Sequence, residues 1–301
     1  MPTLWACSYR IEVRYDRMNN GKLGHRATPG QRGIVGRTGE KEAGASGSAQ
    51  EAGDPLHVEA IARAFRVLEV FSTGAQPRSL GELAAASGLP KSAVQRVVHT
   101  LVRLGYMEVR PRGGHAPGRK LLDRSFDYQR SEPMLERAIP VLIDLQRAIG
   151  ERVDLALLDD LTMLYVWRLE SRRETFRAGL GGRRIPAWCS SGGIAVLSRL
   201  PEKRVDDVLA RSQLVAATPF TLTDPVRIRE RIAETRRLGY ALLSQELQIG
   251  IIALAAPIVQ PDGGPMAAVH ITARLADVDE ETARRRLAPA LMEAANAIGD
   301  A

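Results

Sequence analysis

The sequence has few cysteines, few aromatic residues and no long apolar run. Two of its 301 residues are cysteines, Cys7 and Cys189, and aromatic residues make up 5%. Two cysteines form neither a disulfide framework nor a metal cluster, which fits a reducing cytosol. No apolar stretch approaches the roughly 20 residues of a membrane span, and the charged N-terminal segment is not a secretory signal. We therefore expect a cytoplasmic protein that does not associate with membranes and has aliphatic cores.

The sequence also lacks the spacing that metal and cofactor sites require. Its five histidines are scattered, without the short intervals of a metal-binding motif. The stretch 179–182 is a fragment of a dinucleotide-binding fingerprint without its strand and helix, and we interpret it as a loop. We expect no metal and no cofactor.

The net charge of +7 is concentrated in one region. Residues 57–122 carry ten basic and four acidic side chains, whereas residues 123–301 carry 24 basic and 25 acidic ones. This distribution predicts a small polyanion-binding module joined to a larger, nearly neutral domain. Residues 1–56 are rich in Gly, Ser and charge. We predict a disordered tail there and assign it no function.

The basic region is predicted to contain helices followed by a hairpin. Apolar residues at helical spacing indicate a first amphipathic helix, and these are Val58, Ile61, Phe65, Leu68 and Phe71. Ser79 and Glu82 form a capping box that begins a second, short helix. A tight turn at 88–92 leads into a third helix that ends at Gly105. The strand 106–110 and a short return strand follow.

The third predicted helix has an apolar face and a basic polar face. Val94, Val97, Val98, Leu101 and Leu104 share one side. The opposite side carries no acid and offers donors suited to phosphates and base edges. Helices, a glycine-containing turn, a basic helix and a hairpin are typical of a winged helix-turn-helix that binds double-stranded DNA. The alternative is a solvated face on a small helical domain.

We predict DNA contacts from two groups of residues in this module. Residues near and on the third helix would enter the major groove, and arginines of the wing would contact phosphates. Arg96 has an alternative structural interpretation, a pair with Glu82 or Glu69. The full set is Ser79, Lys91, Ser92, Gln95, Arg96, His99, Arg103, Arg110 and Arg112.

The remainder of the chain alternates helices with strands linked by hairpins, which indicates an α+β sheet domain. A helix with an internal Pro140 is expected from Leu135 to Ile149. Further predicted helices cover 190–200, 202–210, 226–238 and 280–298. Predicted strands cover 153–158, 162–168, 240–243, 251–258 and 266–272.

Two local features of this domain suggest chemistry. Residues 186–193 place hydroxyls and two glycines where a helix begins, so free N–H groups there suit a carboxylate. An ordinary N-cap by Ser190 or Ser191 explains the same residues equally well. Cys189 and His270 are a conceivable nucleophile and base, but we favour a buried structural cysteine.

Together these segments resemble the IclR family of bacterial transcription regulators over about residues 57–298. The resemblance is carried by the order and spacing of segments 64–69, 83–92, 96–106, 182–186, 191–200, 223–225, 239–241 and 255–257. It implies a winged helix-turn-helix at 57–120, a linker helix at 121–134 and an α/β, GAF-like effector-binding domain at 135–301. It also implies self-association as dimers or pairs of dimers.

A finer resemblance points to the branch that responds to aromatic acids of the β-ketoadipate pathway. Segments 185–193 and 245–247 carry it. The chain departs from the family where Ile194 replaces a basic residue, where Leu243 and Ser244 stand near the place of an acid, and where the second wing strand reads 115–118. The resemblance assigns effector contacts to Trp188, Cys189, Ser190, Ser191, Gly192, Gly193, Leu243, Gln245, Glu246, Ala253, His270 and Thr272.

The sequence thus predicts a DNA-binding transcriptional regulator whose operator binding responds to a small carboxylic acid. Ala253 replaces a frequent Cys or Ser, and His270 and Thr272 replace small hydroxyl residues, so an aromatic or bulky acid fits better than glyoxylate or pyruvate. Two alternatives remain: an enzyme acting on a small acid, and a DNA-binding protein without a ligand. Repression and activation are equally open.

Overall fold

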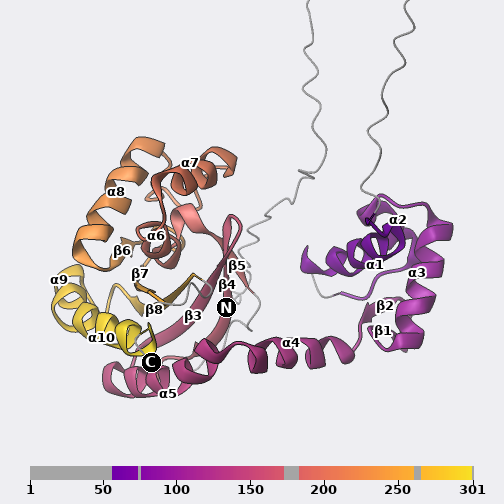
Figure 1. Ribbon diagram of the computed structural model, residues 1–301, viewed down its shortest axis with the longest axis horizontal. Coiled ribbons are helices and arrows are strands. Elements are labelled where there is room, and N and C mark those ends of the chain that lie inside the picture. Colours follow the sequence, from indigo (N-terminus) through magenta and orange to yellow (C-terminus); the bar gives the residue numbers. More distant parts are fainter. Residues whose placement is uncertain (1–55, 74–75, 173–182, 261–265, 300–301) are drawn as a thin grey trace, which may run out of the picture. The chain divides into compact units, whose positions relative to one another are not determined.

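The computed structural model describes residues 56–73, 76–172, 183–260 and 266–299 (Figure 1). Nearly all of the predicted tail at 1–56, including Cys7, and the predicted loop at 179–182 lie outside these residues. The chain divides into two compact units between Arg124 and Ser125, and each is described separately.

The N-terminal unit has the predicted helices and hairpin. Its elements are α1 (Glu59–Glu69), the 3₁₀ turn η1 (Val70–Thr73), α2 (Leu80–Ser87), α3 (Lys91–Leu104), β1 (Met107–Val109) and β2 (His115–Pro117). The two strands pair antiparallel. The core of this unit contains Val67, Leu83, Val94, Val98 and Met107, all nearly inaccessible to solvent. Buried side chains of α3 thus fix which of its faces is exposed.

The predicted apolar face of α1 is only partly buried. Ile61 is 56% exposed and Phe65 60% exposed, and Val58 before the helix is also exposed. The helix packs instead through Val67, and Phe71 of η1 is buried beside it. Periodicity identifies an apolar face, but the neighbouring helices decide which part of it they cover. The exposed stripe of Val58, Ile61 and Phe65 is called the α1 stripe below.

The segment predicted as one linker helix contains a break. Helix α4 (Lys120–Ser131) ends two residues before Pro133, where α5 (Pro133–Ile149) begins. Glu132 between them has an extended backbone, with φ −110° and ψ 94°. A proline disfavours helical backbone at the residue before it and is well placed at the first position of a helix. Pro133 therefore accounts for both the end of α4 and the start of α5.

The C-terminal unit is built around one antiparallel sheet in the order β5-β4-β3-β8-β7-β6. The strands predicted from the sequence are present, whereas β5 was not predicted. The bounds are β3 (Arg152–Asp159), β4 (Thr162–Leu169), β5 (Arg184–Pro186), β6 (Ala241–Ser244), β7 (Ile251–Ile258) and β8 (Ala267–Arg274). Sequence-distant strands β3 and β8 lie side by side at its centre.

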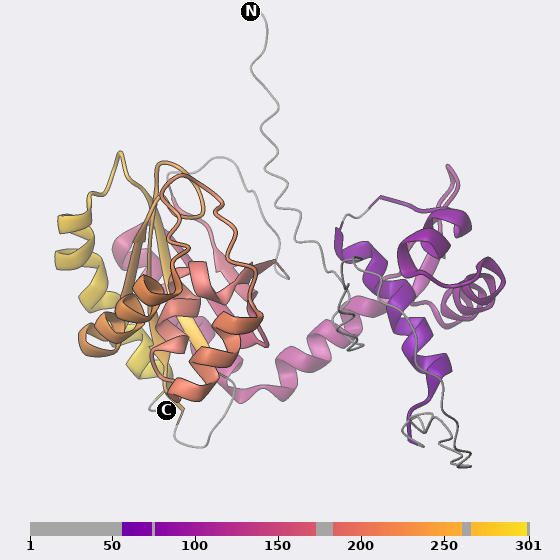
Figure 2. The same ribbon diagram turned by 90° about the horizontal axis from the view of Figure 1, so that it is seen from above.

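Helices cover both faces of this sheet (Figures 1 and 2). Helices α5 and α10 (Ala288–Gly299) pack on the face that carries Leu155, Leu254 and Ile271. The other face is covered by α6 (Ser191–Leu197), with α7 (Glu202–Arg211) and α8 (Pro225–Leu238) outside it. This second face is lined by small side chains, which let α6 approach the strands closely. We call it the α6 face.

The predicted C-terminal helix is interrupted. It consists of α9 (Glu280–Thr282), a π-helical turn η3 (Ala283–Leu287) and α10. Pro289 has no N–H to donate to the carbonyl four residues earlier, and a local π turn is one way in which a helix accommodates this loss.

The helices of the described residues are too short or too polar to span a membrane. The His, Cys, Asp and Glu side chains of the same residues do not gather in a group of three or more that could hold a metal ion.

Candidate functional sites

Both ends of α2 are fixed by local capping interactions. The Ser79 N–H donates to Glu82 at 2.7 Å, and the Glu82 N–H donates to Ser79 Oγ at 3.3 Å, which is the predicted capping box. Gly88 ends α2 with φ 65°, a left-handed conformation that favours glycine. Because Ser79 Oγ caps α2, any DNA contact of this side chain would be additional to that role.

The exposed face of α3 carries the predicted DNA-reading residues. Helix α3 contains no acidic residue, and its buried residues are Val94, Val98 and Leu101. Leu104, predicted to share that apolar face, is 51% exposed. The exposed polar side chains of the helix are Lys91, Ser92, Gln95, Arg96, His99, Thr100 and Arg103. Such a face supplies donors without a competing carboxylate.

Arg96 is not used as a structural anchor. Among the described residues it makes no ion pair, and Glu82, one of the two partners considered from the sequence, accepts the Ser79 N–H instead. Its backbone carbonyl accepts a bond from Thr100 Oγ1 inside the helix. Its guanidinium is therefore available on the surface.

The wing positions its two arginines differently. Arg110, directly after β1, pairs with Glu108 of that strand at 2.9 Å. Arg112 lies exposed in the turn between β1 and β2 and forms no ion pair within the described ranges. The wing is anchored to the segment before α2, because His115 and Arg78 exchange two backbone hydrogen bonds. Arg112 is thus the wing cation with the least competition.

The N-terminus of α6 is an ordinary capped helix end. Ser190 Oγ accepts the Gly193 N–H at 3.1 Å, so this donor is already used. A Cβ on Gly193 would lie 2.0 Å from the Ala187 carbonyl oxygen. A Cβ on Gly192 would lie 2.0 Å from His270 Cε1. Both glycines therefore permit close packing, and of the two interpretations open from sequence the N-cap explains this end.

His270 is enclosed between α6 and the sheet. Its Nδ1 lies 3.4 Å from Tyr165 Oη and 3.5 Å from Ser191 Oγ, while its Nε2 is buried without a hydrogen-bond partner among the described residues. Burial, together with the positive charges of Arg152 and Arg168, lowers the pKa of His270 to about 3. The imidazole is therefore neutral at physiological pH.

A cluster of arginines around one buried aspartate lies beside His270. Asp154, 1% exposed, pairs with Arg168 at 2.5 Å and with Arg152 at 3.4 Å. Asp154 is directly opposite His270 in the β3–β8 ladder, so these side chains share the α6 face. Positive charge exceeds negative charge here. Arg152 Nε is also buried without a hydrogen-bond partner among the described residues.

The electrostatics of the cluster extend to Arg183. Arg183 is exposed, and its pKa is lowered by partial desolvation of the guanidinium and by the charges of Arg168 and Arg152. Burial alone would lower the pKa of Arg168, but Asp154 outweighs it and the pKa is raised. We call Arg152, Arg168, Arg183 and Asp154 the arginine cluster. Sequence reasoning missed it, although the alternation Arg152–Asp154 and the predicted hairpin pointed to one shared face.

Three of the residues predicted to contact the effector continue this site along the sheet. Thr272 is opposite Arg152 on one side and Ala253 on the other, and Ala253 is opposite Leu243. Thr272 and Ala253 are half-buried, whereas Leu243 is buried. Residues that are directly opposite each other on neighbouring strands share a face of the sheet. A row therefore crosses the α6 face from the cationic Arg152, through Thr272 and Ala253, to the apolar Leu243.

Other predicted effector residues lie in the core or stabilise a loop. Trp188 and Cys189 are buried in the core beneath α6. Burial and Glu246 raise the pKa of the Cys189 thiol to about 12. Gln245, at φ 62°, accepts the Gly250 N–H, and the Glu246 carboxylate pairs with Arg231 at 2.6 Å and accepts the Leu222 N–H. Gln245 and Glu246 thus hold the 245–250 loop in place.

Comparison with known proteins covers both units. Residues 60–111 match the family described as the IclR helix-turn-helix domain, and residues 126–300 match the bacterial transcriptional regulator IclR C-terminal domain. The second match alone spans more than half of the chain. The chain belongs to the IclR family of bacterial transcriptional regulators.

Individual IclR-family relatives agree with this assignment. The Pca regulon regulatory protein of Pseudomonas putida is 28% identical over 80% of this chain and 83% of its own length. The transcriptional repressor IclR of Escherichia coli (strain K12) is 29% identical over 74% of this chain and 83% of its own length. The crystal structure of an IclR homologue complexed with 4-hydroxybenzoate, from Microbacterium hydrocarbonoxydans, has a TM-score of 0.70 and 26% identity, covering 80% of this chain and 98% of that one. This regulator therefore combines a DNA-binding helix-turn-helix with the C-terminal domain characteristic of the family.

Proposed function

We propose that this IclR-family regulator binds operator DNA with α3 in the major groove. The observation that carries the proposal is the acid-free, exposed face of α3. Gln95 and Arg96 offer the amide and guanidinium groups that read base edges, and Arg112 offers a cation to the phosphate backbone.

The effector is proposed to be a small carboxylic acid bound beside the arginine cluster. Its carboxylate would contact Arg152, which is 24% exposed. The start of α6, one of two interpretations open from the sequence, is not the proposed contact. Thr272 and Ala253 would lie beneath the remaining part of the bound effector. An excess of guanidinium groups over carboxylates favours an anion, and arginine binds carboxylates through paired hydrogen bonds.

An aromatic acid is the more specific proposal. It is supported by the names of similar proteins, since one regulates the Pca regulon, one activates p-hydroxybenzoate hydroxylase expression in Acinetobacter baylyi, and one was crystallised with 4-hydroxybenzoate. Within this chain, the apolar end of the row at Ala253 and Leu243 suits a ring. The binding energy difference required is modest, since about 1.4 kcal/mol of coupling changes operator affinity tenfold.

We further propose that the protein is not an enzyme. The best nucleophile in the C-terminal unit, Cys189, has a strongly raised pKa and is a buried thiol. His270 contacts Tyr165 and Ser191 within the described residues, and its ring is closed off by Gly192. A Cys189→Ala variant with unchanged operator and effector binding supports this proposal. The proposal is contradicted if the unmodified protein turns over a small acid and the Cys189→Ala variant does not.

Self-association is proposed through the α1 stripe. Val58, Ile61 and Phe65 form a contiguous apolar row that is more than half exposed, and such rows mark protein interaction surfaces. Sedimentation of the full chain tests this: Phe65→Glu is expected to shift the protein towards the monomer. An unchanged assembly would place the interface elsewhere.

The central experiment is fluorescence anisotropy of the full chain on its own upstream intergenic DNA. It is performed at two salt concentrations, with and without 4-hydroxybenzoate and the uncharged analogue 4-hydroxybenzamide. We expect salt-sensitive binding that the acid shifts and the amide does not. Tight binding that no acid shifts would contradict the effector proposal, and no preference over random DNA would contradict the operator proposal.

Arg152→Met tests the anion contact itself. Calorimetry with 4-hydroxybenzoate, or with the acid that shifts DNA binding, should show an affinity at least about tenfold weaker than that of the unmodified protein. Arg147→Met is the matched control, because Arg147 is an exposed helical arginine whose one ion pair among the described residues is with Asp144, three residues away. Equal loss in both variants would contradict the assignment.

A further inference from the structure

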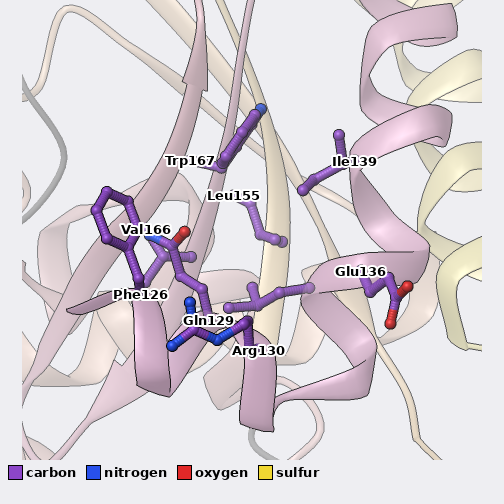
Figure 3. Close-up of a pocket in the computed structure, with 9 residues that line it drawn as sticks. Phe126, Gln129, Arg130, Glu136, Ile139, Leu155, Val166 and Trp167 are labelled. Carbon is purple, nitrogen blue, oxygen red and sulfur yellow. The ribbon is translucent and has the colours of Figure 1, made fainter. Parts of the chain in front are cut away.

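A pocket of about 520 Å³ lies on the opposite side of the sheet from the arginine cluster. It is formed by the last turns of α4, the first turns of α5, and strands β3 and β4. Figure 3 shows Trp167 and Ile139 near one end of this space and Phe126 beside Val166 near the other. Its size is within the range of roughly 300–1,000 Å³ that small-molecule sites occupy in proteins.

The pocket is separated from the arginine cluster by the β3–β4 hairpin. Trp167 and Arg168 are consecutive on β4, so their side chains lie on opposite faces. Trp167 is opposite Leu155, which also lines the pocket, whereas Arg168 is opposite Asp154. A molecule in the pocket therefore contacts different side chains from one bound by the arginines.

The chemistry of the lining favours an uncharged molecule. Most of it is apolar, including Phe126, Ile139 and Trp167. Arg130 pairs with Asp127 at 2.5 Å, and in Figure 3 the Glu136 carboxylate points away from Phe126 and Trp167. The pocket thus offers extensive apolar contact, with the Arg130 charge balanced by Asp127 and the Glu136 carboxylate turned away from the rings.

Two polar groups of the lining have unused hydrogen-bonding capacity. Trp167 Nε1 is buried without a hydrogen-bond partner among the described residues. The amide of Gln129, which also lines the pocket, forms no side-chain hydrogen bond within the described ranges. A buried donor without a partner is costly, and an oxygen atom on an occupant would offset that cost.

We propose that this pocket is a second small-molecule site, which takes an uncharged aromatic compound of one or two rings with a hydrogen-bond acceptor. The flat faces of Trp167 and Phe126 suit a ring, and Gln129 or the indole N–H binds the acceptor. The occupant contacts the C-terminal turns of α4, the helix whose N-terminal turn belongs to the other unit. This site does not depend on the proposed effector site.

Calorimetry of the full chain with 2-naphthol tests the proposal. We expect saturable binding at a single site, weakened at least about fivefold in Ile139→Trp, whose larger side chain takes up part of the pocket. Arg152→Met is the matched control, because it changes the opposite face, and it should keep its affinity for 2-naphthol. Thermal unfolding verifies that each variant is folded. If Ile139→Trp does not fold, Phe126→Ala replaces it, since Phe126 is 49% exposed, and should weaken binding at least about fivefold.

Three outcomes would overturn this inference. The first is the absence of saturable 2-naphthol binding. The second is binding that survives Ile139→Trp and disappears in Arg152→Met, which would place the probe at the arginine cluster. The third is a change of assembly state in Ile139→Trp, seen by sedimentation without any probe, which would identify the pocket as a surface for a second copy of the chain.

Discussion

Gly192 and His270 are packed so closely that no side chain fits between them. A Cβ on Gly192 would lie 2.0 Å from His270 Cε1 and 2.1 Å from Nε2. The glycine at the start of α6 and the histidine at the centre of β8 are therefore one packing unit. This contact fills the space beside the start of α6, where a bound carboxylate was one of two interpretations open from the sequence.

Gly192→Ala should destabilise the C-terminal unit by about 1–3 kcal/mol, because the buried imidazole must move away from the new methyl group. In the double variant with His270→Ala, the alanine at 192 should cost much less. Urea unfolding of the two single variants and the double variant measures this coupling. Additive effects of the two changes would show that the contact is not as close as described.

The stability of the folded protein should fall as the pH is lowered, in part through His270. Its pKa is lowered to about 3 in the folded state from an ordinary 6.5, so between these pH values only the unfolded chain takes up the proton. The loss should approach about 1.4 kcal/mol per pH unit in this window. Urea unfolding between about pH 5 and pH 7 should show a smaller slope for His270→Gln. An equal slope in both proteins would mean that His270 is charged when folded.

Cys189 should be inert towards thiol reagents in the folded protein. Burial, with a contribution from Glu246, raises the pKa of this thiol to about 12, and the thiolate is the reactive species. A chain in which Cys7 is replaced by Ser isolates the signal. We expect no fast labelling by Ellman's reagent until denaturant is added. Rapid labelling of the native protein would reopen the enzyme interpretation.

Gln95→Ala and Arg112→Ala should weaken DNA binding in different ways. Loss of the Gln95 amide is expected to cost about 1–3 kcal/mol at one base pair and to change sequence preference. Loss of Arg112 should weaken binding to all sequences and reduce the salt slope by about one unit. Arg110→Ala serves as the comparison and should have a smaller effect, since Arg110 pairs with Glu108 at 2.9 Å. Equal loss on every sequence for Gln95→Ala would contradict base reading.

Local patterns in the sequence were sufficient for most of the elements. The capping box of Ser79 and Glu82, the hairpin around Asp159 and Asp160, and the acid-free face of α3 depend on neighbours along the chain, and the structure has each of them. The prolines did not by themselves reveal where the predicted helices are interrupted. Pro133 divides the predicted linker segment, and Pro289 follows a π-helical turn in the predicted final helix.

The tertiary structure decided which surfaces face each other. The α1 stripe is apolar by sequence, yet its burial depends on how α2 and α3 cover α1. Arg152, Asp154 and Arg168 come from two strands, and His270 reaches them from a third more than 100 residues later in the chain. Periodicity places residues on one face of one strand, but register and strand order bring charges together. For that reason the sequence was enough to predict the acid-free face of α3 and the family, whereas the folded sheet brought the arginines together on one face and Trp167 to the other.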